Sequence, residues 1–472
     1  MKKDPHVRFL EMLGCKGAEL EEFLPKWRKA ADFLTLSDED VEYAVEEWLP
    51  VYWDLSLKGV RMMIAACIRE VVELSRSQEY MDAGEPVMYI NIPSTPMCIN
   101  ANKIAGQGKL HIAYSGYIMV LVLGAFFNKD SNVYGCGLNN HCSNCKMNFI
   151  RANACHSGIL PPPTITWNWG MKCDEAPKTD ELISCLYGDK WKDVFITIPH
   201  DASLGEVESE NEERVNYLAE KLRQAQKQVS EATGIEVTED HLCASMEEYM
   251  LYMQRVEQLA DLVMNARPQP VSGNELMLFG ICADMCLEIG YPYVIDALET
   301  FIAEVKERIA AGYGILPADA PRLSCQFNLL YAPWVEKAFR DNGVCLTQGR
   351  TFPFASLYDT YMREGDSYKI AAKITLATPS AMNMMDEARI NQSLLERYPT
   401  DGALYGFYSF DKWVGANQKL MIQEIEKKTG VPHFYVEGDL WASGRSSAEE
   451  RAALIRSVCN CLKISIYQVR KQ

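Results

Sequence analysis

The sequence predicts an α/β protein with two lobes, each built on a parallel sheet flanked by helices, behind a helical N-terminal segment. Short apolar runs that end near proline or glycine alternate with amphipathic stretches, which is typical of strands joined through helices. The chain has 472 residues, which suits about two to four domains of ~150 residues each. Apolar residues make up 48% of it, enough to fill extensive cores.

Residues 1–85 are expected to be helical. Ser37 is followed at once by a cluster of acidic residues, as at a helix N-cap with acids in the first turn. Apolar residues then recur at helical spacing over 53–77. Gly84-Glu85-Pro86 ends this pattern and marks the end of the segment.

The first α/β lobe is expected over residues 86–266. VMYINIP (87–93) predicts a buried strand, and Ser94 or Thr95 is placed to cap a following helix. A strand that enters a helix N-terminus is a frequent ligand site, although an ordinary capped helix is the simpler interpretation. DVFITIP (193–199) predicts a second strand, and the polar stretch 205–265 predicts helices with a solvated face.

A helical connection is expected over 267–320, after the Arg-Pro-Gln-Pro junction at 267–270. Cys282 and Cys286, which are four residues apart in a predicted helix over 273–312, are interpreted as core residues rather than metal ligands. The second α/β lobe is expected over 321–472, and its predicted strands are 322–330, 344–348, 402–410 and 432–439.

Composition limits the function. The formal charge of -17 disfavours nonspecific binding to nucleic acid or to an anionic membrane. The N-terminus lacks an apolar signal core, so the chain is expected to be cytoplasmic. The apolar run 117–127 is too short to span a bilayer and is expected to be a buried element. In a reducing compartment the 16 cysteines are expected to be thiols or ligands rather than disulfides.

Cysteines gather in the stretch 136–174, which also holds two histidines and three consecutive prolines. This composition favours neither helix nor strand. Thiolates on loops are the ligands that soft metals and iron–sulfur clusters require, although a single free cysteine is more often a small buried hydrophobe. For the group we favour metal or cluster binding. Zinc held by Cys142, Cys145 and either Cys155 or His156 is an alternative.

The order of several motifs resembles the family of 2-hydroxyacyl-CoA dehydratase and benzoyl-CoA reductase subunits. Cys142-Ser143-Asn144-Cys145-Lys146 and the later Leu160–Pro163 step are similar to the first cluster-ligand segment of that family. Cys173-Asp174 is similar to its second segment. Further matches follow in order: Ile196–Asp201, Tyr217-Leu218, Thr233-Gly234, Arg267–Pro270, Asp401-Gly402, Gly430–Pro432 and Glu437–Asp439. At the place of the third cluster cysteine, this sequence has Asp411.

The resemblance implies a subunit of an oxygen-sensitive enzyme that removes water from a 2-hydroxyacyl-CoA through a ketyl radical. It implies a [4Fe–4S] cluster, with Cys142 and Cys173 as ligands and Asp411 or Cys145 as the third. Ser94 and Thr95 are candidates for substrate contacts. The family also implies a related second subunit and a separate ATP-dependent iron–sulfur activator, and this chain has no phosphate-binding GxxxxGK[ST] loop of its own.

The resemblance leaves two other functions open, and Asp411 in place of the third cluster cysteine motivates the second of them. The chain could be a subunit of the benzoyl-CoA reductase type, which reduces an acyl-CoA. It could instead be a non-catalytic partner that lacks a complete cluster.

Overall fold

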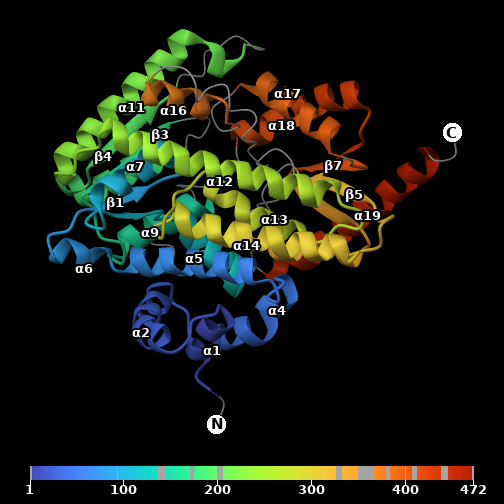
Figure 1. Cartoon of the computed structure of the whole chain (residues 1–472), viewed down its shortest axis with the longest axis horizontal. Coiled ribbons are helices and arrows are strands. Elements are labelled where there is room, and N and C mark those ends of the chain that lie inside the picture. Colours follow the sequence, from blue (N-terminus) through green and yellow to red (C-terminus); the bar gives the residue numbers. More distant parts are fainter. Residues whose placement is uncertain are drawn as a thin grey trace.

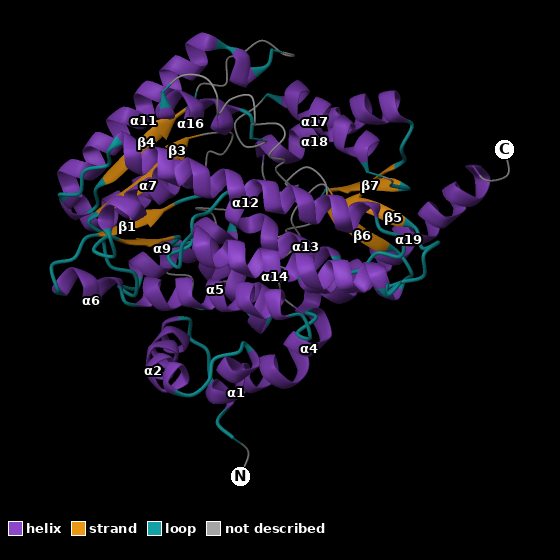
Figure 2. Cartoon of the chain, in the orientation of Figure 1, coloured by secondary structure: helices purple, strands orange, loops and turns teal. Residues whose placement is uncertain are grey.

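Two separate four-stranded parallel sheets, each flanked by helices, follow a helical N-terminal segment (Figures 1 and 2). The predicted fold class is therefore confirmed. The structure, a computed structural model, describes residues 3–92, 94–130, 132–134, 145–170, 175–198, 206–325, 332–348, 366–378, 383–398, 400–406, 412–436 and 445–469.

The N-terminal segment is helical as predicted. Its helices are α1 (Pro5–Met12), α2 (Ala18–Phe33), α3 (Asp38–Tyr43), α4 (Leu49–Tyr52), α5 (Lys58–Ser75) and α6 (Ser77–Asp82). Ser37 caps α3 in a capping box with Asp40, which confirms the expected start. Helix α5 packs closely along α14 (Tyr291–Ala310). A Cβ atom at Gly59 would lie 2.5 Å from the Cβ of Phe301, so only glycine permits this approach.

The first sheet has the strand order β2-β1-β3-β4. Its strands are β1 (Val87–Ile90), β2 (His111–Ala113), β3 (Ile165–Gly170) and β4 (Asp193–Thr197). The helices around it are α7 (Pro96–Gly106), α8 (Tyr117–Leu121), α9 (Lys146–His156), α10 (Glu175–Tyr187) and α11 (Glu212–Thr233). The apolar run after β2 forms α8 and a buried π-helical turn, as expected of a buried element.

The expectation that 136–174 forms neither helix nor strand is wrong for the described part of that stretch. Helix α9 and strand β3 both lie within it. The β3 sequence ITWNWG is rich in the β-branched and aromatic residues that strands favour, and it is buried on both faces. The neighbouring prolines and cysteines concealed this signal.

The second sheet has the order β6-β5-β7-β8. Its strands are β5 (Arg322–Cys325), β6 (Cys345–Gln348), β7 (Gly402–Tyr405) and β8 (His433–Tyr435). The helices of this part of the chain are α15 (Pro333–Asp341), α16 (Ser367–Leu376), α17 (Met384–Arg397), α18 (Lys412–Thr429) and α19 (Arg445–Val469). Although α16 comes late in the chain, it packs against α11 beside the first sheet (Figure 1).

The connection between the sheets consists of α13 (Gly273–Gly280) and α14, and the long helix α12 (Glu239–Asn265) lies beside both. The predicted continuous helix 273–312 is wrong between residues 281 and 290. The backbone turns there and α14 starts anew after Gly290, whose φ of +86° suits glycine. Cys282 and Cys286 are buried in the core, as expected. No described helix is long and apolar enough to cross a membrane.

Candidate functional site

The candidate site lies at the carboxyl ends of the strands, where parallel α/β sheets bind their ligands. In the first sheet this edge holds Ser94 and Thr95 after β1, and Tyr114 after β2. The start of α9 also lies here, close to the segment that follows β2. A Cβ atom at Gly116 would lie 2.7 Å from the backbone oxygen of Met147.

Three of the predicted cluster ligands, Cys142, Cys173 and Asp411, lie outside the described residues. Their described neighbours are helix starts and strand ends. Strand β3 ends at Gly170 and α10 begins at Glu175, whereas α18 begins at Lys412. Within the described ranges, no group of three or more His, Cys, Asp or Glu side chains is arranged to hold a metal.

Cys145 is the one predicted cluster ligand that the structure describes. It is buried and occupies the N-cap position of α9, and its carbonyl accepts the Phe149 amide at 2.9 Å. A thiolate at a helix N-terminus is stabilised by the helix dipole and by nearby amide groups. The position therefore fits a metal-binding thiolate that is shielded from water.

The zinc arrangement that combines Cys145 with Cys155 or His156 is contradicted. Cys155 and His156 end α9, whereas Cys145 precedes it. At 1.5 Å per residue, the two ends of this helix are about 15 Å apart, too far for ligands of one ion. Burial also raises the pKa of the Cys155 thiol to about 12, as expected of a core residue.

A chain of buried hydrogen bonds joins Ser94 to the connection between the sheets. The Ser94 hydroxyl donates to the Asp284 carbonyl at 2.8 Å, and the Cys286 amide donates to the Tyr114 hydroxyl at 2.9 Å. The Ser94 and Tyr114 oxygens are 3.2 Å apart, so Tyr114 donates to Ser94. The Ser94 proton is thus already engaged. The Thr95 hydroxyl, beside the start of α7, has no hydrogen-bond partner among the described residues.

Asp284 lies beside the candidate site, at a position that no sequence pattern indicates. Its carboxyl group forms no hydrogen bond or ion pair with the described residues, although its backbone oxygen accepts from Ser94. Enclosure by the protein raises the pKa of this carboxyl to about 6. This position lies within the continuous helix predicted over 273–312, where a single aspartate does not indicate a functional site.

A second buried network fixes the helices that follow the two cysteine segments. Arg151 of α9 donates two hydrogen bonds of 2.8 Å to the carboxylate of Asp180 on α10. Asn91, directly after β1, donates to Asp180 at 3.3 Å and to Asn168 of β3 at 3.0 Å. All four side chains are buried. The network holds α9 and α10 against the carboxyl end of β1.

Comparison with known proteins bears on the same region. The sequence model of the family described as 2-hydroxyglutaryl-CoA dehydratase, D-component, matches residues 135–453. A benzoyl-CoA reductase subunit of Thauera aromatica is 25% identical over 158 residues, which cover 31% of this chain. The alignment spans 37% of that relative, well under two thirds of its length.

Proposed function

Because the chain belongs to the 2-hydroxyglutaryl-CoA dehydratase D-component family, we propose that it is a subunit of an oxygen-sensitive 2-hydroxyacyl-CoA dehydratase. The family match over residues 135–453 carries this proposal. The similarity to a protein named as part of a benzoyl-CoA reductase supports an acyl-CoA as the substrate. In this proposal a related second subunit completes the enzyme, and a separate ATP-dependent activator supplies the electron.

The proposed cofactor is a [4Fe–4S] cluster held by Cys142 and Cys173, with Asp411 or Cys145 as a further ligand. The burial of Cys145 at the carboxyl edge of the first sheet supports a ligand that water does not reach. Thiolate is also the usual ligand of cluster iron, whereas a carboxylate is harder and less common. When bound, such a cluster would supply one low-potential electron to the thioester carbonyl, which allows the α-hydroxyl to leave.

The residues of the chain have separate tasks in this proposal. Thr95 can donate a hydrogen bond to the substrate, because its hydroxyl has no partner among the described residues. Ser94 is the weaker candidate, since its proton is bonded to the Asp284 carbonyl. Asp284 is suited to accept the proton that dehydration removes, because a pKa of about 6 lies near the pH at which a base works best.

A reductase of the benzoyl-CoA type is the alternative function, supported by the similarity to the Thauera aromatica reductase. Product analysis separates the two activities. Dehydration consumes no net reductant, whereas reduction of an acyl-CoA consumes reductant in proportion to product.

Iron content tests the cofactor proposal directly. The chain is purified without oxygen, together with any partner that co-purifies, and iron and sulfide are measured in wild type, Cys173→Ala and Cys185→Ala. Cys185 is exposed on α10 and serves as the matched control. We expect about four irons per chain in wild type and control, and loss in Cys173→Ala. A folded chain without iron would instead support a non-catalytic partner, and zinc in its place would contradict electron transfer through this chain.

A further inference from the structure

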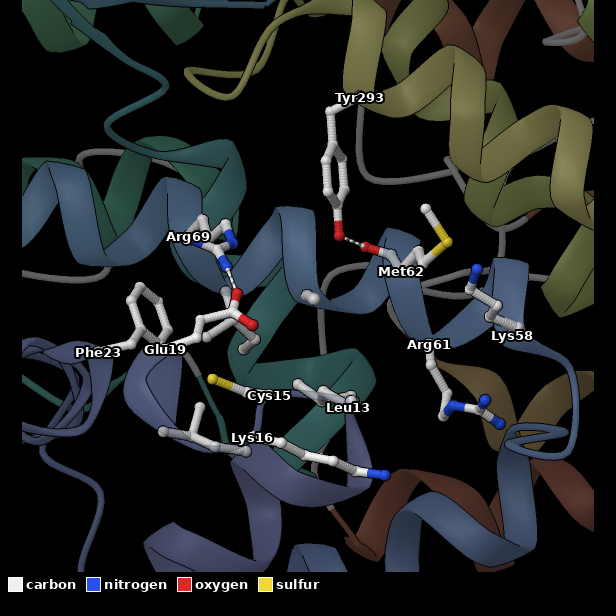
Figure 3. Close-up of a pocket in the computed structure, with 14 residues that line it drawn as sticks. Leu13, Cys15, Lys16, Glu19, Phe23, Lys58, Arg61, Met62, Arg69 and Tyr293 are labelled. Atoms are coloured by element: carbon white, nitrogen blue, oxygen red, sulfur yellow. Dashed lines mark hydrogen bonds and ion pairs between the residues drawn. The ribbon is translucent and has the colours of Figure 1, made fainter. Parts of the chain in front are cut away.

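A cavity of about 360 Å³ lies in the N-terminal part of the chain, among the α1–α2 loop, α5 and α14 (Figure 3). Its lining residues on α5 recur every three or four positions from Lys58 to Arg69 and so share one helix face. Leu13, Met62 and Ile68 contribute apolar surface. This size is at the lower end of the range for small-molecule pockets.

The charge of the cavity is opposite to that of the chain. The lining includes four cations, Lys16, Lys58, Arg61 and Arg69, but only one carboxylate, Glu19. Glu19 is already neutralised, because Arg69 donates to it at 2.5 Å. Lys16 and Arg61 therefore have no carboxylate partner in the lining, although the whole chain carries a formal charge of -17.

Two of these cations lie on the same side of the cavity. Figure 3 shows the charged ends of Lys16 and Arg61 below α5, away from the Arg69–Glu19 pair, whereas the Lys58 ammonium points upward, away from the Arg61 guanidinium. Within the part of the chain that the structure describes, the Lys16 ammonium has no acidic partner, whereas the Glu304 carboxylate lies beside Lys58 and accepts its backbone amide at 2.6 Å. The side-chain hydrogen bonds of Arg61 are made by one terminal nitrogen to the backbone oxygens of Leu55 and Ser56, so they hold its guanidinium without neutralising it.

The loop that carries Lys16 is held in shape. Gly14 and Gly17, on either side of Cys15 and Lys16, have φ values of +102° and +57°, which glycine adopts without strain. The Cys15 amide donates to the Leu10 carbonyl at 3.0 Å, and the buried Cys15 side chain faces the cavity. Lys16 is thus presented from a fixed turn, which reduces the entropy lost when it binds a ligand.

We propose that this cavity binds a small amphipathic anion, with a carboxylate or phosphate group at Lys16 and Arg61 and an apolar body over Leu13, Met62 and Ile68. Lys16 and Arg61 are like charges that line one concave site, and a bound anion offsets the repulsion between them. The apolar surface adds affinity that a bare inorganic anion cannot gain. The cavity adjoins none of the residues assigned to catalysis above, so this inference does not depend on the proposed function.

Calorimetric titration of the purified protein tests the inference, with any partner retained. Octanoate and octyl phosphate carry both required features, with different head groups. Inorganic phosphate lacks the apolar body and 1-octanol lacks the charge. We expect octanoate, octyl phosphate or both to bind, with affinity that falls as salt rises. Phosphate and octanol should bind at least about ten-fold more weakly than the better of the two, a difference of about 1.4 kcal/mol.

Variants locate the binding. Lys16→Gln with Arg61→Gln should weaken binding of the anion about ten-fold or more, whereas Lys306→Gln, at an exposed lysine of α14 outside the lining, should not. Ala65→Phe should weaken it by filling the apolar floor. Melting temperatures confirm that each variant is folded. The inference is overturned if neither amphipathic anion binds at up to about 10 mM, if octanol binds as tightly as the better of the two, or if the paired variant binds like wild type.

Discussion

Replacement of Asp180 by alanine should destabilise the region around the candidate site. Arg151 and Asp180 form a buried ion pair, with side chains 1% and 4% exposed and two hydrogen bonds of 2.8 Å. The substitution leaves the guanidinium in the core, where the remaining described contact is Asn148 at 3.2 Å. The pair joins α9 to α10, so the damage should centre on these two helices.

The expected loss of stability is about 3–5 kcal/mol, the range for removing one partner of a buried ion pair. An independent sum agrees, because two hydrogen bonds to a charged group contribute about 1.5–3 kcal/mol each. Most of this cost comes from leaving the Arg151 charge buried without a carboxylate partner, rather than from the lost attraction between Arg151 and Asp180. The double variant Arg151→Met with Asp180→Leu should therefore recover most of the stability.

Hydrogen exchange and thermal melting measure this effect, since a chain of this size is not expected to unfold in a single step. Asp180→Ala should lower the melting temperature and increase exchange in α9 and α10. Asp189→Ala is the control, because Asp189 is exposed just after α10. The reasoning is refuted if Asp180→Ala melts like the control and exchange in both helices is unchanged.

Three further predictions concern the core and the site. Gly406→Ala should destabilise the end of β7 by about 2 kcal/mol or more, seen as a lower melting temperature, because its φ is +108° and the new Cβ would lie 2.4 Å from the Val436 oxygen. Burial raises the pKa of Glu70 from 4.5 to about 8. The native state thus holds a proton that the unfolded chain releases, and the stability from Glu70 is complete below pH 4.5 and lost as pH rises towards 8. Glu70→Gln should lessen the fall in melting temperature across that interval, and an unchanged fall would contradict this assignment. Asp284→Asn should abolish the rise of turnover with pH near 6 while leaving the melting temperature nearly unchanged; a retained rise would exclude Asp284 as the base.

Local patterns predicted much of the fold. Six of the eight described strands follow from apolar runs. Helices α15 and α18 end close to Gly343 and Gly430, which both have positive φ, a common signal of a helix end. Strand β2 was missed because its three residues, HIA, form no apolar run, whereas the equally short β8 lies within the longer predicted strand 432–439. Strand β3 was missed because the surrounding composition dominated the window.

The site was less predictable than the fold, because its groups meet only in the folded chain. Asp180 is 29 positions from Arg151, and Asp284 is 190 positions from Ser94. No local pattern couples residues at such separations. Burial gives Asp284 its raised pKa, and burial is a property of the whole fold rather than of neighbouring residues.

The position of α16 has a consequence for how such a protein can be divided or inherited. After strands β5 and β6 of the second sheet, the chain returns to the first sheet, where α16 packs against α11. There Arg223 forms an ion pair with Asp366 at 2.6 Å, and its guanidinium lies over the ring of Tyr368. A recombination event or an expression boundary at the junction 267–320 would separate α11 from the helix that covers it. The two halves are therefore expected to be inherited together. A fragment that ends at the junction should aggregate through the surface of α11 that α16 covers in the whole chain.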